Sequence, residues 1–208
     1  MRTYIVLDLE WNQSPVGKEG AVEAIPFEII EIGAVKLDEN LEYMSKFHEF
    51  ISPVVYNDIH HRIYELVHID INYLRDKGKK FLSVIGKFKQ WCYMEGQEPM
   101  FCTWGSMDLS ELQRNMAYHK QENFFEYPLF YYDIQKLFTL DRCDDPKERL
   151  PLEKAVRQLG LPIKGEFHHA LDDAYYTSLL LSKINFEALK VYKSLDLYRS
   201  PNSEEEEI

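Results

Sequence analysis

The chain has few cysteines, no long hydrophobic run and fewer basic than acidic residues. Cys92, Cys102 and Cys143 are far apart, so their spacing forms neither a disulfide framework nor a zinc signature. No apolar run approaches the roughly 20 residues that a transmembrane helix needs, so we expect no membrane partner. The first residues lead directly into a predicted strand, so we expect no signal peptide and a cytoplasmic protein.

The deficit of positive charge argues against one class of nucleic-acid binder. The 24 lysines and arginines face 35 aspartates and glutamates, which leaves a net charge of -11. A protein that coats nucleic acid through electrostatics would have the opposite balance. Part of the charge lies in Glu204–Glu207, and we expect residues 200–208 to form a disordered acidic tail after a single domain over residues 1–199.

Hydrophobic patterning predicts an α/β protein. Apolar and β-branched runs predict strands over residues 3–11, 27–37, 43–51, 99–104 and 129–133. Apolar residues at helical spacing predict helices at 58–76 in short pieces, 81–91, 106–119, 150–159 and from 168 or 169 to about 189. Three consecutive strands followed by alternating helices and strands favour a mixed five-stranded sheet with helices on both faces. This is the layout of a ribonuclease H-like fold.

Two acids stand close together in the first predicted strand. Asp8 and Glu10 are two residues apart, so their side chains point to the same face. Like charges at this distance are costly unless a counter-charge neutralises them, and carboxylate oxygens suit Mg²⁺ or Mn²⁺. The alternative is a pair of solvated acids where the strand leaves the sheet.

Two further segments carry acids that could meet this pair. Asp108 follows the strand at 99–104 and begins the next helix, where Ser106 is a candidate cap. An aspartate there could also simply complement the helix dipole. The segment Phe167–Ala174 places two histidines before Asp173 at the start of the last helix. Histidines at such a junction are otherwise ordinary surface residues.

Together these segments resemble a known family. Asp8-Leu-Glu-Trp11, Ile29-Ile-Glu-Ile-Gly-Ala-Val35, Trp104-Gly-Ser-Met-Asp108 and His168-His-Ala-Leu-Asp-Asp-Ala174 occur in the order and spacing of the DEDDh group of DnaQ-like 3′→5′ exonucleases. The residues of these motifs are similar to those of the branch that contains KapD-like and histone-mRNA-type exonucleases. The resemblance runs from Thr3 to about Leu181.

The resemblance implies a set of catalytic residues. It assigns the metal-binding acids, for two Mg²⁺ or Mn²⁺ ions, to Asp8, Glu10, Asp108 and Asp173. It assigns the general base to His168, five residues before Asp173. Helix geometry alone would favour His169, since residues four apart share a face. Both observations hold if His168 lies on a loop just before the helix.

The resemblance also implies an activity. We expect a 3′→5′ exonuclease that releases nucleoside 5′-monophosphates from the 3′ end of single-stranded RNA or DNA, with RNA slightly favoured. Leu9 and Trp11 flank the acids and are candidates to contact the terminal base. Trp11 could equally be a core residue that closes the sheet. The rival hypothesis is a binding or regulatory module that keeps this fold without the chemistry.

Overall fold

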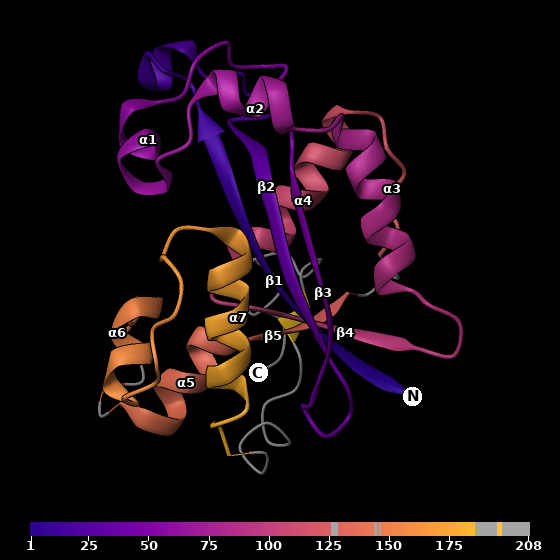
Figure 1. Ribbon diagram of the computed structural model, residues 1–208, viewed down its shortest axis with the longest axis vertical. Helices are drawn as coiled ribbons and strands as arrows, with labels where there is room; N and C mark the ends of the chain where they lie inside the picture. Colours follow the sequence, from indigo (N-terminus) through magenta and orange to yellow (C-terminus); the bar gives the residue numbers. More distant parts are fainter. Residues whose placement is uncertain (126–128, 144, 146, 186–194, 197–208) are drawn as a thin grey trace, which may run out of the picture.

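A mixed β-sheet forms the centre of the computed structural model (Figure 1). Its strands lie in the order β3-β2-β1-β4-β5-β6. They are β1 (Arg2–Gln13), β2 (Phe27–Leu37), β3 (Tyr43–Phe50), β4 (Glu98–Thr103), β5 (Phe130–Asp133) and β6 (Leu195–Asp196). β1 runs antiparallel to β2 and parallel to β4. The predicted α/β sheet of five strands is confirmed, and the two-residue β6 extends its edge.

The structure describes residues 1–125, 129–143, 145, 147–185 and 195–196. Their helices are η1 (Gly17–Gly20), α1 (His61–Val67), α2 (Ile71–Lys77), α3 (Phe81–Cys92), α4 (Met107–Tyr118), α5 (Ile134–Arg142), α6 (Leu152–Gln158) and α7 (Ala170–Leu181). Within these ranges no helix has the length and apolarity to cross a bilayer. The predicted tail at 200–208 and the domain end at residue 199 lie outside the described residues.

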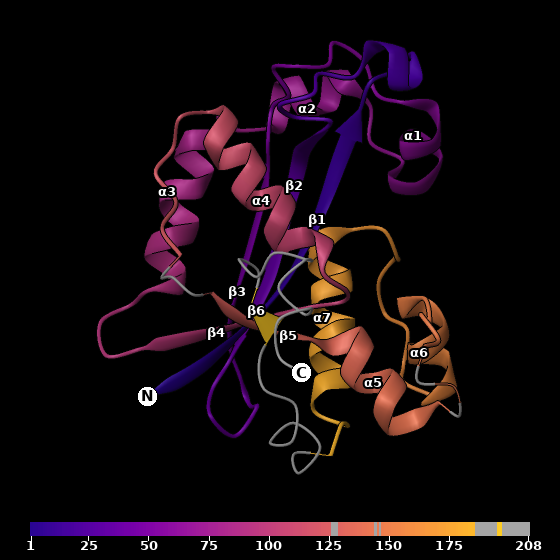
Figure 2. The same cartoon turned by 180° about the vertical axis from the view of Figure 1, so that it is seen from behind.

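Helices cover both faces of the sheet, as predicted. The alternation of side chains along β1 creates two hydrophobic layers. Ile5, Leu7 and Leu9 pack with α3 and α4, whereas Tyr4 and Val6 pack with α5, α6 and α7. Figures 1 and 2 show these two groups of helices on opposite sides of the sheet. The acids at positions 8 and 10 continue the face of β1 that carries Tyr4 and Val6.

α7 is shorter than the sequence predicted. The sequence predicts a helix to about residue 189, but α7 ends at Leu181, and residues 186–189 lie outside the described part of the chain. Ser182 N–H still bonds to Ser178 O four residues back, but the following two amides bond to carbonyls three residues back, with Lys183 N–H donating to Leu180 O at 2.9 Å and Ile184 N–H to Leu181 O at 3.3 Å. This tighter turn ends the helix. Ile184 is buried in the hydrophobic layer that Tyr4 and Val6 form with α5, α6 and α7.

Candidate active site

Five polar side chains from three segments of the chain converge on one cleft of about 500 Å³, which we call the acidic cleft. Asp8 and Glu10 come from β1, Asp108 from the first turn of α4 and Asp173 from the first turn of α7. His168 comes from the turn before α7. The full lining is Asp8, Leu9, Glu10, Trp11, Trp104, Gly105, Ser106, Met107, Asp108, Gln135, Arg149, His168 and Asp173. All seven residues predicted from the sequence are therefore brought together.

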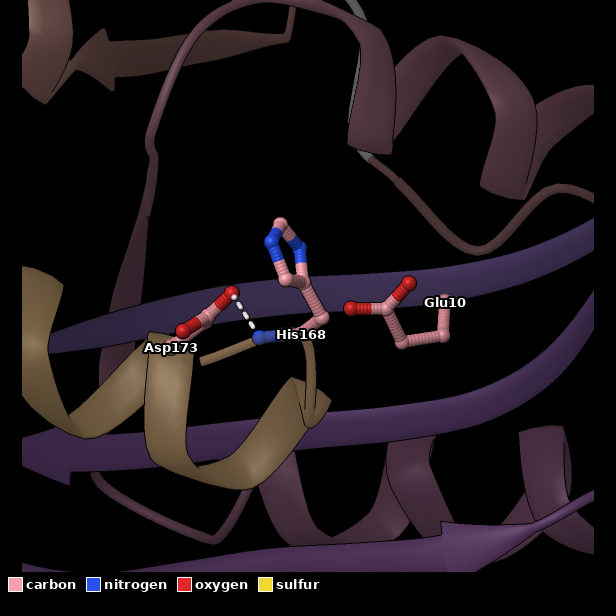
Figure 3. A group of neighbouring side chains, drawn as sticks. All are labelled: Glu10, His168 and Asp173. Carbon is pink, nitrogen blue, oxygen red and sulfur yellow. Dashed lines mark hydrogen bonds between the residues drawn. The ribbon is translucent and has the colours of Figure 1, made fainter. Parts of the chain in front are cut away.

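Backbone amides orient two of the acids. Leu9 N–H donates to Asp108 Oδ1 at 3.2 Å, which ties the start of α4 to β1. His168 N–H donates to Asp173 Oδ2 at 3.1 Å (Figure 3). The other oxygen, Asp173 Oδ1, is buried and has no hydrogen-bond partner among the described residues. Because buried polar atoms are rarely left alone, this oxygen indicates a ligand that the protein itself does not supply.

His168 lies on a turn two residues before α7 and has a left-handed backbone, with φ of 69°. Its side chain is exposed, and its ring rises between the carboxylates of Glu10 and Asp173 in Figure 3. One ligand atom from each of these three residues lies within 4.8 Å of the others. The loop position removes the conflict between a five-residue spacing and helix geometry. His169 instead occupies the N-cap position of α7.

The acids of the cleft resist ionisation. Burial is the main cause that raises the pKa of Glu10 to about 9, and that of Asp108 and Asp173 to about 7. Burial also raises the pKa of Asp8 well above its ordinary value, and the charges of Asp108 and Asp173 add to this effect. Carboxylates packed so closely need a counter-charge to be ionised near neutral pH.

The four carboxylates fit divalent cations. Hard cations such as Mg²⁺ and Mn²⁺ prefer carboxylate oxygens, and the cleft offers these together with an unpartnered buried oxygen on Asp173. Two divalent cations would offset four carboxylate charges. The donor set, with one imidazole at the edge, is therefore suited to a metal centre open to solvent.

The sequence analysis missed a fifth acid beside the cleft. Glu31 on β2 pairs in register with Glu10 and is 1% exposed. Its Oε1 lies 2.7 Å from His48 Nε2, and its Oε2 lies 3.7 Å from His169 Nδ1. Burial raises the pKa of Glu31, but the two histidines outweigh it and the net pKa is lowered. A charged residue inside the apolar run of β2 was the signal that could have found it.

Two other lining residues had no signal in the sequence. Gln135 and Arg149 belong to separate segments, and no spacing rule links them to the acids, whereas Trp104 begins the motif that ends at Asp108. The structure also corrects the prediction that Ser106 caps the helix. It occupies the N-cap position of α4, as expected, but its side chain makes no capping hydrogen bond. The α4 terminus is held instead by the bond between Asp108 and Leu9.

The fold and the cleft define a ribonuclease H-like α/β protein with a carboxylate centre. The family model described as Exonuclease (RNase T) matches residues 5–181. This match spans most of the chain, and the chain therefore belongs to the exonuclease family. None of the curated proteins matches it significantly in sequence.

Solved structures share the fold. The nuclease domain of 3'hExo, a DEDDh family member bound to rAMP, has a TM-score of 0.76 at 17% identity, over 94% of this chain and 97% of that one. Cell-death related nuclease 4 (CRN-4) has a TM-score of 0.69 at 20% identity, over 92% and 64%. E. coli exonuclease I with a dA16 oligonucleotide has a TM-score of 0.73 at 10% identity, over 92% and 43%.

Proposed function

We propose that this protein is a metal-dependent 3′→5′ exonuclease that releases nucleoside 5′-monophosphates from single-stranded nucleic acid, with RNA slightly favoured over DNA. The observation that carries the proposal is the convergence of Asp8, Glu10, Asp108, Asp173 and His168 in one cleft. We also propose that the chain belongs to the KapD-like and histone-mRNA-type branch, because the residues of its motifs are similar to those of that branch. Cys92 and Cys102 are buried free thiols, in keeping with a cytoplasmic location.

The four carboxylates would hold two Mg²⁺ or Mn²⁺ ions. When bound, such cations lower the pKa of a coordinated water and stabilise negative charge on a phosphate. The protein's part is to hold the carboxylates in place. β1 fixes Asp8 and Glu10, while the amides of Leu9 and His168 orient Asp108 and Asp173.

His168 would accept the proton of the attacking water. An imidazole exchanges protons near neutral pH, and this ring is exposed at the edge of the carboxylate group. Its backbone amide is already bonded to Asp173, so the position of the base is coupled to that of one acid.

Leu9 and Trp11 would bind the terminal base. Leu9 is 4% exposed and packs mainly in the core layer, so only its edge reaches the cleft. Trp11 is half-buried and its ring centroid lies 5.9 Å from that of Phe27. It packs against the hydrophobic layer that Ile5, Leu7 and Leu9 form with α3 and α4, and it also lines the cleft. A ring that is fixed on one side and open on the other is suited to stack on a base.

The test is degradation of 5′-labelled single-stranded RNA and DNA with Mg²⁺ or Mn²⁺, compared with EDTA. We expect a ladder that shortens from the 3′ end, abolished by EDTA and by Asp8→Asn. The matched control is Asp76→Asn, because Asp76 is an exposed acid on α2 whose side chain pairs with neighbouring Lys77. The faster substrate decides between RNA and DNA.

A second outcome would favour the rival hypothesis. If the protein binds Mn²⁺ but degrades neither substrate, a binding or regulatory module becomes the better description. The presence of all four acids and His168 in one cleft argues against that module, since a protein without chemistry has no need to keep them together.

A further inference from the structure

Arg149 is the one lysine or arginine among the residues that line the acidic cleft. Its side chain is 56% exposed, so the guanidinium faces solvent at the rim. Four carboxylates and two divalent cations would balance each other in charge. The phosphodiester of a substrate adds a further negative charge, for which Arg149 is the counter-charge that the cleft lining supplies.

The guanidinium is held at one end by acceptors. Its Nη1 donates to Asp133 Oδ2 at 3.1 Å and to Gln135 Oε1 at 3.3 Å. The Asp133 side chain is 2% exposed, and its other oxygen accepts a bond from Lys136 N at the start of α5. Asp133 is therefore a fixed anchor. A guanidinium has five N–H donors, so donors remain for a phosphate oxygen.

The backbone on both sides of Arg149 is also held by side chains. Leu150 O accepts from Trp104 Nε1 at 3.1 Å and from Gln135 Nε2 at 3.0 Å. Glu148 O accepts from Thr139 Oγ1 at 3.0 Å. Trp104 and Gln135 themselves line the cleft. An exposed arginine in a loop usually loses much conformational entropy when it binds, and these bonds reduce that cost beforehand.

We propose that Arg149 binds a phosphate of the nucleic-acid substrate in the acidic cleft, through donors that Asp133 and Gln135 leave available. The inference rests on the proposed function and deepens it. Asp133, Gln135 and Trp104 act as positioning residues for this arginine. The competing structural role is that Arg149 only neutralises the buried Asp133, and that role predicts no effect on how substrate binding depends on salt.

The experiment measures binding of a 5′-labelled single-stranded oligonucleotide by fluorescence anisotropy in Mg²⁺ across a salt series. His168→Asn serves as the background, to slow turnover. Arg149→Gln should weaken binding roughly tenfold. It should also reduce the slope of log K against log salt by about 0.7, as expected when a single strand loses one phosphate contact.

Two further variants complete the design. Arg157→Gln is the matched control, because Arg157 pairs with Glu153 at 2.6 Å on α6 and does not line the cleft. It should leave both affinity and slope unchanged. Arg149→Lys keeps the charge without the planar fork, so it should retain the slope and lose several-fold in affinity.

The outcomes separate this inference from the proposed function. Failure of the wild-type protein to degrade any oligonucleotide would count against the exonuclease itself. Wild-type degradation, with Arg149→Gln and Arg157→Gln identical in slope and affinity, would overturn only the role of Arg149. If Arg149→Gln does not fold by its melting curve, an Arg149→Lys variant with wild-type affinity would overturn it.

Discussion

Gly33 on β2 lies directly against Ala170, the first residue of α7. A Cβ atom on Gly33 would stand 2.1 Å from the carbonyl carbon of Ala170 and 2.1 Å from the amide nitrogen of Leu171. Gly33 is also the register partner of Asp8. The absence of a side chain at this one position therefore lets the helix that carries Asp173 approach the strand that carries Asp8.

Gly33→Ala should damage the site and the fold together. The added methyl group meets backbone atoms that cannot rotate away, so we expect a loss of about 1–3 kcal/mol in the free energy of unfolding. A shift of about 1 Å at His168 and Asp173 would lower kcat/KM roughly 100-fold. Gly86→Ala in α3 is the control, since nothing lies within 4 Å of its added Cβ. That control should gain about 1 kcal/mol of stability with normal activity.

The two variants are compared by denaturant unfolding and by kcat/KM on a single-stranded oligonucleotide. Normal activity in Gly33→Ala would mean that the close approach of α7 to β2 is not what sets the geometry of the cleft.

His168→Asn should slow turnover strongly while the protein still binds metal. Asparagine tolerates the left-handed backbone of this position, so the change removes the imidazole without adding strain. We expect kcat to fall about 10²–10⁴-fold. Calorimetric titration with Mn²⁺ should show affinity close to that of the wild type. A large loss of Mn²⁺ affinity would instead identify His168 as a ligand.

His169→Asn distinguishes the two adjacent histidines. The ring of His169 lies near Glu31, with Nδ1 3.7 Å from Oε2, and it does not line the cleft. We therefore expect less than a tenfold change in kcat. A larger loss than in His168→Asn would reverse the assignment of the base.

Trp11→Leu should weaken substrate binding. Base stacking contributes about 1–3 kcal/mol per base to binding, so its loss corresponds to a rise in KM of roughly 5- to 150-fold. Because Trp11 also packs against the core, Trp91→Leu is the control. Trp91 is another half-buried tryptophan of the same layer that does not line the cleft. Equal KM values for the two variants, measured well below their melting temperatures, would make Trp11 a core residue only.

The metal-free protein should lose stability as the pH rises. Asp108 and Asp173 have folded-state pKa values of about 7, and Glu10 of about 9. Unfolded acids titrate near pH 4. Between these values the folded state binds more protons than the unfolded state. The stabilisation is complete below about pH 4 and is lost as the pH rises through about 7 and 9.

Melting curves in EDTA and in Mg²⁺ over this pH range test the prediction. The melting temperature in EDTA should fall as the pH rises, and the gain from Mg²⁺ should be largest at the alkaline end. Asp8→Asn removes one buried charge, so it should flatten the EDTA curve and abolish most of the gain. A melting temperature in EDTA that rises with pH would contradict the raised pKa values.

Much of the fold could be predicted because its signals are local. The β-branched run of β1 and the helical spacing in α3 each identify an element without reference to the rest of the chain. The candidate acids and His168 could be located because their segments resemble a family in order and spacing, and the structure brings these residues together. Their catalytic roles stay predictions.

By itself, then, the sequence determined most of the elements, five strands of the sheet and, through the family resemblance, the acids and His168 of the acidic cleft. Only the tertiary structure decided that His168 lies on a turn before α7, that Glu31 holds His169 and His48, and that Arg149 stands at the rim. The reason is physical. The bond from Trp104 to Leu150 O joins residues 46 positions apart, and the contact of Glu31 with His169 joins β2 to the start of α7. Such contacts form only when the sheet and its helices pack, and no local pattern of residues encodes them.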